Sequence, residues 1–169
     1  AQKIDKNEVK QLKAFLSQPA EKGGTNATAL KITDLSSPAT WEGVTVAGGH
    51  VTAIEWKDKH LAGDLDLSGF DALTKVDVSR NAITSISVAG DAALTELNAS
   101  RNKLSTLTLS DNTALTKLTV YRNRLTELDI TGTPMLKNVN CSNNLLVELS
   151  VANSTTLETL NCQGCHLEA

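Results

Sequence analysis

Aromatic side chains are scarce in this chain: phenylalanine, tryptophan and tyrosine make up 3% of its 169 residues. The chain has no excess of positive charge: it contains 16 lysines and arginines and 19 acidic residues, and its net charge is −3. That balance argues against a general nucleic-acid binder or a basic membrane-surface protein. No apolar run approaches the roughly 18–20 residues that a membrane helix needs, and no signal-type apolar stretch is visible. With 40% apolar and 21% charged residues, the chain is expected to be globular.

What the chain has is a strict internal repeat of 21 residues. The copies begin at Leu73, Leu94, Leu115, Leu136 and Leu157, and read LTKVDVSRNAI, LTELNASRNKL, LTKLTVYRNRL, LKNVNCSNNLL and LETLNCQGCHL. With the first leucine as position 0, apolar residues recur at positions 3, 5 and 10. Asparagine fills position 8 in the first four copies, and Cys165 replaces it in the last; the four asparagines are Asn81, Asn102, Asn123 and Asn144.

The second half of each repeat carries the same apolar spacing about ten residues later, for example at Ile83, Ile86 and Val88. Because a 21-residue unit leaves no room for a bulky helix, we expect two short strands per coil, joined by tight turns. An earlier coil fits with a period of 22 residues, beginning at Val51. Trp56 is expected to be a core residue of that coil.

The pattern LxxLxLxxNxL resembles the leucine-rich repeat family over roughly residues 51–169. The resemblance implies a mainly β fold, a right-handed solenoid in which each LxL segment forms one rung of a concave parallel sheet. It also implies that the position-8 asparagines hydrogen-bond to backbone groups in the turns. Strand geometry agrees, since alternate residues face opposite ways, which places positions 3 and 5 inside and positions 2, 4 and 6 outside.

The first fifty residues are different in kind, so we expect a helical N-terminal cap over 1–50 and a solenoid over 51–169, with one cap-proximal coil and five repeats. Asp5 and Glu8 have the spacing of a capping box before an amphipathic helix. The segment from Trp41 to Val44 resembles the N-terminal cap of plant-type leucine-rich repeat proteins. The combination of this cap with rungs similar to LNCSNN, such as VNCSNN at residues 139–144, also resembles secreted leucine-rich repeat proteins of Bacteroidetes. That resemblance implies an extracellular or cell-surface protein whose export signal has been removed.

Three cysteines lie near the C-terminus, and the segment from Cys162 to His166 spells the haem-attachment pattern C-x-x-C-H. Together with Cys141, these residues also provide enough side chains to count as four zinc ligands. The repeat explains them more simply, because Cys141 and Cys162 both occupy the apolar position 5. We therefore expect core thiols, no metal and no cofactor, with a disulfide among the three as the alternative. His50 and His60 are expected to be surface histidines.

All four arginines fall between residues 80 and 124, three of them at position 7 of consecutive repeats. The expected ligand-binding residues are Arg80, Arg101, Tyr121, Arg122, Arg124 and Lys103. Arginine and tyrosine are enriched at binding hot spots, so this set predicts contact with an acidic or carboxylate-bearing partner. The alternative is that the arginines are simply solvated and pair with Asp77 and Glu96.

The expected function is a non-catalytic protein-binding module acting through the concave face, as the resemblance implies. An enzyme is the least supported class, because no pocket-forming insertion interrupts the repeats and no serine or cysteine nucleophile stands beside a base. A carbohydrate-binding surface protein is the alternative, although the concave face offers one tyrosine as an aromatic platform. At the C-terminal rung, Leu157, Leu160 and Leu167 predict an open apolar end, which suggests either a continuing chain or an end-to-end homodimer.

Overall fold

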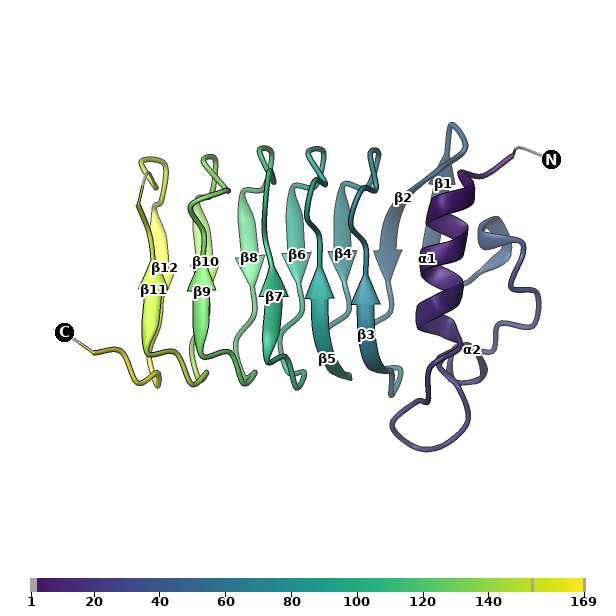
Figure 1. The fold of residues 1–169 in the computed structure, drawn as a ribbon, viewed down its shortest axis with the longest axis horizontal. Helices are drawn as coiled ribbons and strands as arrows, with labels where there is room; N and C mark the ends of the chain where they lie inside the picture. The colour runs from purple at the N-terminus through teal and green to yellow at the C-terminus, as the bar shows by residue number, and fades with distance from the viewer. Residues whose placement is uncertain (1–2, 153, 169) are drawn as a thin grey trace.

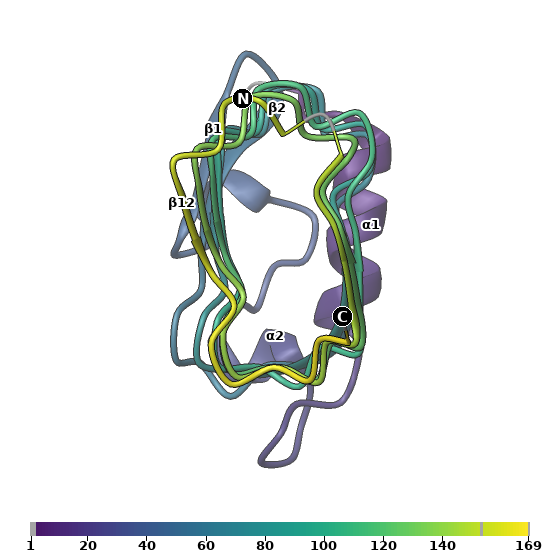
Figure 2. The ribbon, with the colours of Figure 1, turned by 90° about the vertical axis from the view of Figure 1, so that its left-hand side faces the viewer.

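The chain winds into a flattened tube of stacked coils, seen from the side in Figure 1 and along the stack in Figure 2. This computed structural model describes residues 3–152 and 154–168; residues 1, 2, 153 and 169 of the expected cap and solenoid lie outside the described part. Each coil from β2 to β11 contributes one strand to each of two opposite faces, and the described part of the last coil contributes β12 to one of them. The fold expected from the repeat, a mainly β solenoid with two short strands per coil, is confirmed.

One face is a seven-stranded sheet in which β1 is antiparallel to β2 and all later pairs are parallel. Its strands, in spatial order, are β1 (Val44–Ala47), β2 (His50–Glu55), β4 (Lys75–Asp77), β6 (Glu96–Asn98), β8 (Lys117–Thr119), β10 (Asn138–Asn140) and β12 (Thr159–Asn161). From β4 onward the register is uniform, with Leu97 opposite Leu118 and Leu118 opposite Val139. The uniform register follows from the constant repeat length, because a one-residue slip would turn every core side chain outward.

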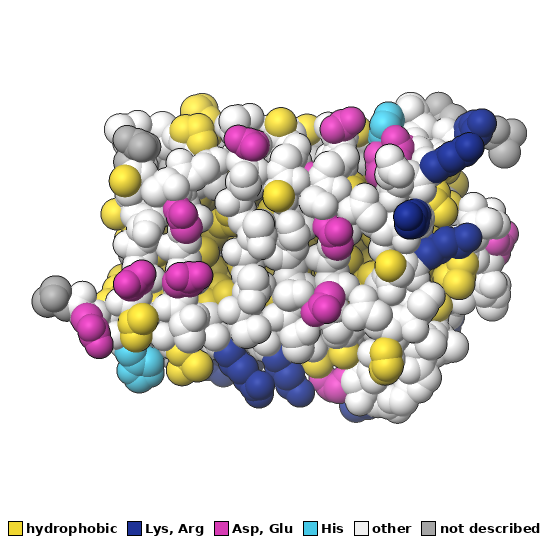
Figure 3. All heavy atoms as spheres, in the orientation of Figure 1, with side chains coloured by type: hydrophobic (Ala, Val, Ile, Leu, Met, Phe, Trp, Pro, Cys, Tyr) yellow, Lys and Arg dark blue, Asp and Glu magenta, His cyan; other side chains and the backbone are white. Residues whose placement is uncertain are grey.

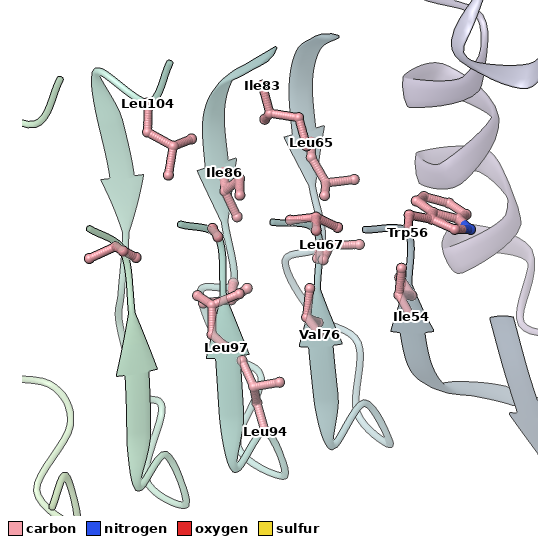
Figure 4. Close-up of a cluster of buried hydrophobic side chains, with 14 of the residues drawn as sticks. Ile54, Trp56, Leu65, Leu67, Val76, Ile83, Ile86, Leu94, Leu97 and Leu104 are labelled. Atoms are coloured by element: carbon pink, nitrogen blue, oxygen red, sulfur yellow. The ribbon is translucent and has the colours of Figure 1, made fainter. Parts of the chain in front are cut away.

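The opposite face holds the second strand of each coil and is divided into two sheets. One contains β3 (Ala62–Asp66), β5 (Ala82–Ser87) and β7 (Thr106–Thr108), and the other contains β9 (Glu127–Asp129) and β11 (Glu148–Ser150). Apolar side chains from the two faces meet between them (Figure 4). Ile54, Trp56 and Val76 come from the first face, while Leu65 and Ile86 come from the second, and all five are buried. Burial removes about 1.5–3 kcal/mol of unfavourable hydration for each large apolar side chain.

A helical segment closes the N-terminal end of the tube. It contains α1 (Lys6–Leu16), the short α2 (Asn26–Ala29) and a 3₁₀ turn (Pro38–Thr40). The Phe15 ring stacks on Trp56 with ring centroids 5.9 Å apart, which attaches α1 to the first coil. Asp5 caps α1 by accepting bonds from the Asn7 and Glu8 amides. The expected capping box is wrong in its second half, because Glu8 turns away from the helix start and accepts a bond from the Val51 amide.

The outer edge of β3 is protected by amide side chains of the cap. Gln18 accepts a bond from the Asp64 amide and donates to the Asp64 carbonyl, and Asn26 does the same with Ala62. Gln11 donates to the carbonyls of Asp66 and Ser68. These side chains make the hydrogen bonds that a neighbouring strand would make, which protects an exposed sheet edge from pairing with another chain.

The C-terminal end of the tube is open, as expected. Along one core column the exposed fraction rises from 0% at Leu118 to 3% at Val139 and 38% at Leu160. Leu167 is also exposed, at 42%. Within the described residues, no helix is both long and apolar enough to span a membrane.

Candidate functional site

The turns that follow the strands of the seven-stranded sheet share one unusual backbone position. Position 7 of the repeat is left-handed in three consecutive coils, with φ of 59° at Arg80, 56° at Arg101 and 56° at Arg122. Asn143 and Gly164 occupy the same position in the last two coils, also with positive φ. Because a left-handed backbone favours glycine and asparagine, arginine has a higher conformational energy at this position.

The buried asparagine column supports these turns from inside. The Asn102 side chain accepts a bond from the Ile83 amide at 3.0 Å and donates to the Val78 and Ala99 carbonyls at 3.0 and 3.1 Å. Asn81, Asn123 and Asn144 repeat the arrangement in their own coils. Each asparagine thus links two successive coils, so the residues of the turn are held in a fixed position.

Four arginines project from this supported edge, with Lys103 and Tyr121 beside them. We call the set of Arg80, Arg101, Lys103, Tyr121, Arg122 and Arg124 the arginine edge. The four arginines and the lysine are exposed, and dark blue side chains gather along the lower edge of the molecule in Figure 3. Among the residues that the structure describes, the salt bridges involve only His50, His60 and Lys75 as cations. The pairing of arginines with Asp77 and Glu96 is therefore absent from this part of the chain.

Tyr121 is the residue that the structure ties most closely to the arginines. The Arg101 guanidinium carbon lies 6.0 Å from the centroid of the Tyr121 ring, within cation–π range. Hydrogen bonding by Ser100 and Arg101, together with the charges of Arg101 and Arg80, lowers the pKa of the Tyr121 hydroxyl. The structure thus brings Arg80, Arg101 and Tyr121 together, while Lys103 lies on the same turn as Arg101, and Arg122 and Arg124 lie on the same turn as Tyr121.

The outward face of the seven-stranded sheet differs from expectation at position 6. Ser79, Ser100 and Ser142 are buried, because each hydroxyl turns back to the position-4 side chain of its own strand. The Ser100 hydroxyl and amide both donate to Asn98 Oδ1, at 2.8 and 3.1 Å. In these three coils positions 2 and 4 therefore form the floor of this face, whereas position 6 stays accessible at Tyr121 and Gln163.

Positions 2 and 4, together with Leu118, Val139 and Leu160 of position 3, line a hollow of about 470 Å³ toward the C-terminal end of the sheet. Its polar side chains are Asn98, Lys117, Thr119, Asn138, Asn140, Thr159 and Asn161, and we call it the sheet groove. A smaller hollow of about 160 Å³ adjoins it and contains the carboxylates of Asp77 and Glu96. The acidic side chains thus lie over β4 and β6, and the sheet groove extends from β6 to β12.

The cysteines behave as core thiols. All three are free, and Cys141 is buried, which raises the pKa of its thiol to about 12. Cys165 takes the asparagine position of the last coil and donates weakly to the Cys141 carbonyl, with 3.3 Å between Sγ and oxygen. A thiol this reluctant to ionise is a poor nucleophile and a poor metal ligand.

Asp5, Glu8 and His50 are the one described group with ligand atoms close enough, within 4.8 Å of one another, to hold a metal ion. Their polar atoms already have structural roles. The two Glu8 oxygens accept from the Val51 amide and contact His50 Nδ1, each at 2.7 Å, and Asp5 caps α1. His50 is thus a docking residue for α1 rather than an isolated surface histidine, and Glu8 raises its pKa.

A second buried ladder lies in the other set of turns. Asp91 and Asn112 are fully buried, and Asn112 donates to the Val88 carbonyl at 2.7 Å. Asp91 Oδ1 accepts from the Phe70 amide, but its Oδ2 has no hydrogen-bond partner among the residues that the structure describes. Burial raises the pKa of Asp91 to about 7.

Comparison with known proteins bears on the fold. No family model and no curated protein matches the chain. Among solved structures, the functional domain of InlJ from Listeria monocytogenes, which includes a cysteine ladder, matches with a TM-score of 0.56 and 34% identity, covering 59% of this chain and 22% of that one. YopM from Yersinia enterocolitica matches with a TM-score of 0.53 and 25% identity, covering 63% of this chain and 25% of that one.

The third similar structure is the LRR ectodomain of the receptor kinase SOBIR1 from Arabidopsis thaliana. It matches with a TM-score of 0.66 and 18% identity, over 99% of this chain and 97% of that one. The fold is that of a leucine-rich repeat solenoid. At this identity the SOBIR1 match supports the fold alone, and this chain spans a quarter or less of InlJ and YopM.

Two features of this leucine-rich repeat solenoid were missed by reasoning from the sequence. One is the left-handed backbone conformation at Arg80, Arg101 and Arg122. The sequence signal for it is that Asn143 and Gly164, residue types that favour this conformation, stand at the same repeat position. The other is the fold-back of position 6, which was readable from the recurring Asp/Asn-x-Ser spacing at Asp77, Asn98 and Asn140. Side chains of aspartate and asparagine commonly bond to the backbone two residues later, which is what that spacing produces.

Proposed function

We propose that this chain is a non-catalytic binding module that recognises an acidic protein through the arginine edge. The observation that carries the proposal is four exposed arginines on three successive turns, with no salt bridge to any carboxylate in the part of the chain that the structure describes. Arginine binds carboxylates through two parallel hydrogen bonds, so a protein surface with aspartate and glutamate side chains is the complementary partner.

Backbone strain gives independent support. A left-handed conformation costs roughly 1–2 kcal/mol at a residue other than glycine or asparagine. The chain carries that cost at Arg80, Arg101 and Arg122, where Asn143 and Gly164 show that easier residues fit the same turn. Strained positions cluster at functional sites, which favours a role for these side chains outside the protein.

Electrostatics points the same way. Strands of neighbouring coils lie about 4.8 Å apart, so the three position-7 arginines form a column of like charges. Two such charges repel by about 1 kcal/mol in water, and a bound carboxylate would relieve that repulsion. Tyr121, with the Arg101 guanidinium over its ring, adds an aromatic contact of the kind enriched at binding hot spots.

The finer parts of the proposal concern setting and assembly. We place the protein outside the cell or at its surface, on the resemblance to secreted leucine-rich repeat proteins of Bacteroidetes and to the plant-type cap. The exposed side chains of Leu160 and Leu167 are consistent with an end-to-end homodimer through the last rung. A glycan is the alternative ligand, for which the polar floor of the sheet groove is the relevant surface.

The test is a parallel screen of the immobilised chain against a displayed library of extracellular proteins and a glycan array. We expect capture of proteins with acidic surfaces, and loss of those proteins when Arg101 and Arg122 are both changed to glutamine. Capture of glycans alone, or of proteins that the double variant still binds equally well, would overturn the proposal.

A further inference from the structure

Three asparagines of the sheet groove have an orientation that backbone hydrogen bonds determine. Asn98 Oδ1 accepts from the Ser100 amide, Asn140 Oδ1 from the Ser142 amide at 3.2 Å, and Asn161 Oδ1 from the Gln163 amide at 3.0 Å. A backbone amide can only donate, so the atom that it contacts must be the asparagine oxygen. The side-chain nitrogen of each asparagine is therefore the atom left to face the groove.

These nitrogens have no internal partner. In residues 3–152 and 154–168, no hydrogen bond is donated by Nδ2 of Asn98, Asn140 or Asn161, whereas Nδ2 of every buried ladder asparagine donates to carbonyls. Asn140 and Asn161 are direct neighbours in β10 and β12. Strands lie about 4.8 Å apart, which is less than twice a hydrogen-bond length of about 2.9 Å, so both nitrogens can reach the same acceptor oxygen.

The charged residues of the groove also favour an anionic ligand. Lys117 is exposed in the groove, and none of its described lining residues carries a carboxylate. The nearest acidic side chain of the sheet is Glu96, opposite Lys117 in the next strand toward the N-terminus. The polar part of the groove therefore presents amide nitrogens, one cation and threonine hydroxyls to a ligand, and Leu118, Val139 and Leu160 complete the lining.

We propose that the sheet groove binds the carboxylates of an extended acidic peptide segment, with one carboxylate between Asn140 and Asn161 and another near Lys117. The outward amide nitrogens and Lys117 are donors, and the carboxylates of an acidic peptide are anionic groups that only accept. A neutral sugar chain has no such anionic acceptor and is favoured by aromatic platforms, which the groove lining lacks among the described residues. This inference rests on the proposed function and names a second contact for its acidic partner.

The chain itself supplies the test variant. Asp77 occupies the position of Asn98 in the preceding strand, and its Oδ1 accepts from the Ser79 amide and hydroxyl in the same way. Changing Asn140→Asp and Asn161→Asp should therefore preserve the fold-back and replace each outward donor by a carboxylate oxygen. The matched control is Thr108→Asp with Ser150→Asp on the opposite face. That pair adds the same charge where Asp129 shows that aspartate is native to the repeat.

The experiment is titration calorimetry at low salt with a short oligo-glutamate peptide, an oligo-glutamine peptide of the same length and polygalacturonate. We expect binding of oligo-glutamate but not oligo-glutamine, at least tenfold weaker in the groove variant and little changed in the control. Equal losses in the groove and control variants would reduce the effect to net charge and overturn the inference. Preference for polygalacturonate over oligo-glutamate would overturn the peptide assignment.

A second comparison separates this inference from the proposed function. With Arg101→Gln and Arg122→Gln changed together, oligo-glutamate binding should weaken, because the edge and the groove contact one acidic ligand. Loss in the edge variant with none in the groove variant would overturn the groove and leave the proposed function standing. Loss in the groove variant alone would overturn the proposed role of the arginine edge and leave the groove supported.

Discussion

The Arg101 guanidinium lies over the ring of Tyr121, 6.0 Å from its centroid, on the turn of the next coil. The contact joins two turns whose backbones are also bonded, since the Arg101 amide donates to the Tyr121 carbonyl at 2.9 Å. Side chain and backbone thus fix the same pair of residues at the edge of the solenoid. Preorganised contacts of this kind lose less entropy when a partner binds.

The ionisation of Tyr121 reports directly on this arrangement. Hydrogen bonding with Ser100 and Arg101 and the nearby positive charges lower the pKa of Tyr121, so it should lie below that of free tyrosine. Tyr121 is the one tyrosine of the chain, so ultraviolet absorbance measures its titration alone. Arg101→Gln should raise the pKa. An identical titration in both proteins would mean that Arg101 does not contact the ring in solution.

The left-handed turns predict opposite effects on stability and binding. Arg122→Asn places in this coil the residue that position 7 already carries as Asn143, so the free energy of unfolding should rise by about 0.5–1 kcal/mol. The same change should weaken partner binding. Chemical denaturation measures the first effect and calorimetry the second. A destabilised variant would show that the arginine supports the turn.

The buried asparagine column predicts a large loss of stability. Asn102→Ala leaves the Ile83 amide and two carbonyls without their partner, so unfolding should become easier by roughly 1–3 kcal/mol. The comparison is Asn138→Ala on the exposed sheet face, which should change stability by less than about 0.5 kcal/mol. Similar denaturation midpoints for the two variants would mean that the ladder contributes little.

Asp91 predicts an unusual dependence of stability on pH. Its pKa of about 7 in the folded protein exceeds the usual 3.8, because burial disfavours the carboxylate more than the Phe70 and Gly69 amides favour it. The charges of Asp71 and Asp66 act in the same direction as burial. Between pH 4 and 7 the folded state keeps a proton that the unfolded state has released, so the contribution of Asp91 falls as pH rises through that range.

Asp91→Asn should remove this dependence, since asparagine fills the equivalent place as Asn112 without a charge. At pH 8 the variant should be more stable than the native protein by on the order of 2–4 kcal/mol, and at pH 4 the two should be similar. Urea denaturation at both pH values measures the difference. A stability gain that is the same at pH 4 and pH 8 would contradict the titration of Asp91.

Much of the fold was predictable because every repeat carries the same pattern of buried and exposed residues. Leucine spacing, strand alternation and the constant period all require the stacked coils, and Trp56 is buried as that logic demands. The docking of the cap was not predictable, because Glu8 bonds to Val51 and His50 across more than forty residues of chain and only the folded structure brings them together. At the site, repeat register predicted which arginines align, whereas the fold-back of Ser100 and the outward nitrogens of the groove depend on local turn geometry.

The most direct test of the account is the affinity of an acidic protein partner from the screen for the double variant Tyr121→Ala with Arg122→Ala. The variant should keep the unfolding midpoint of the native protein, because both side chains lie outside the core. Its dissociation constant should rise at least about tenfold, the effect of losing one binding hot spot. Unchanged affinity in a folded variant would contradict the central claim that the arginine edge is the binding site.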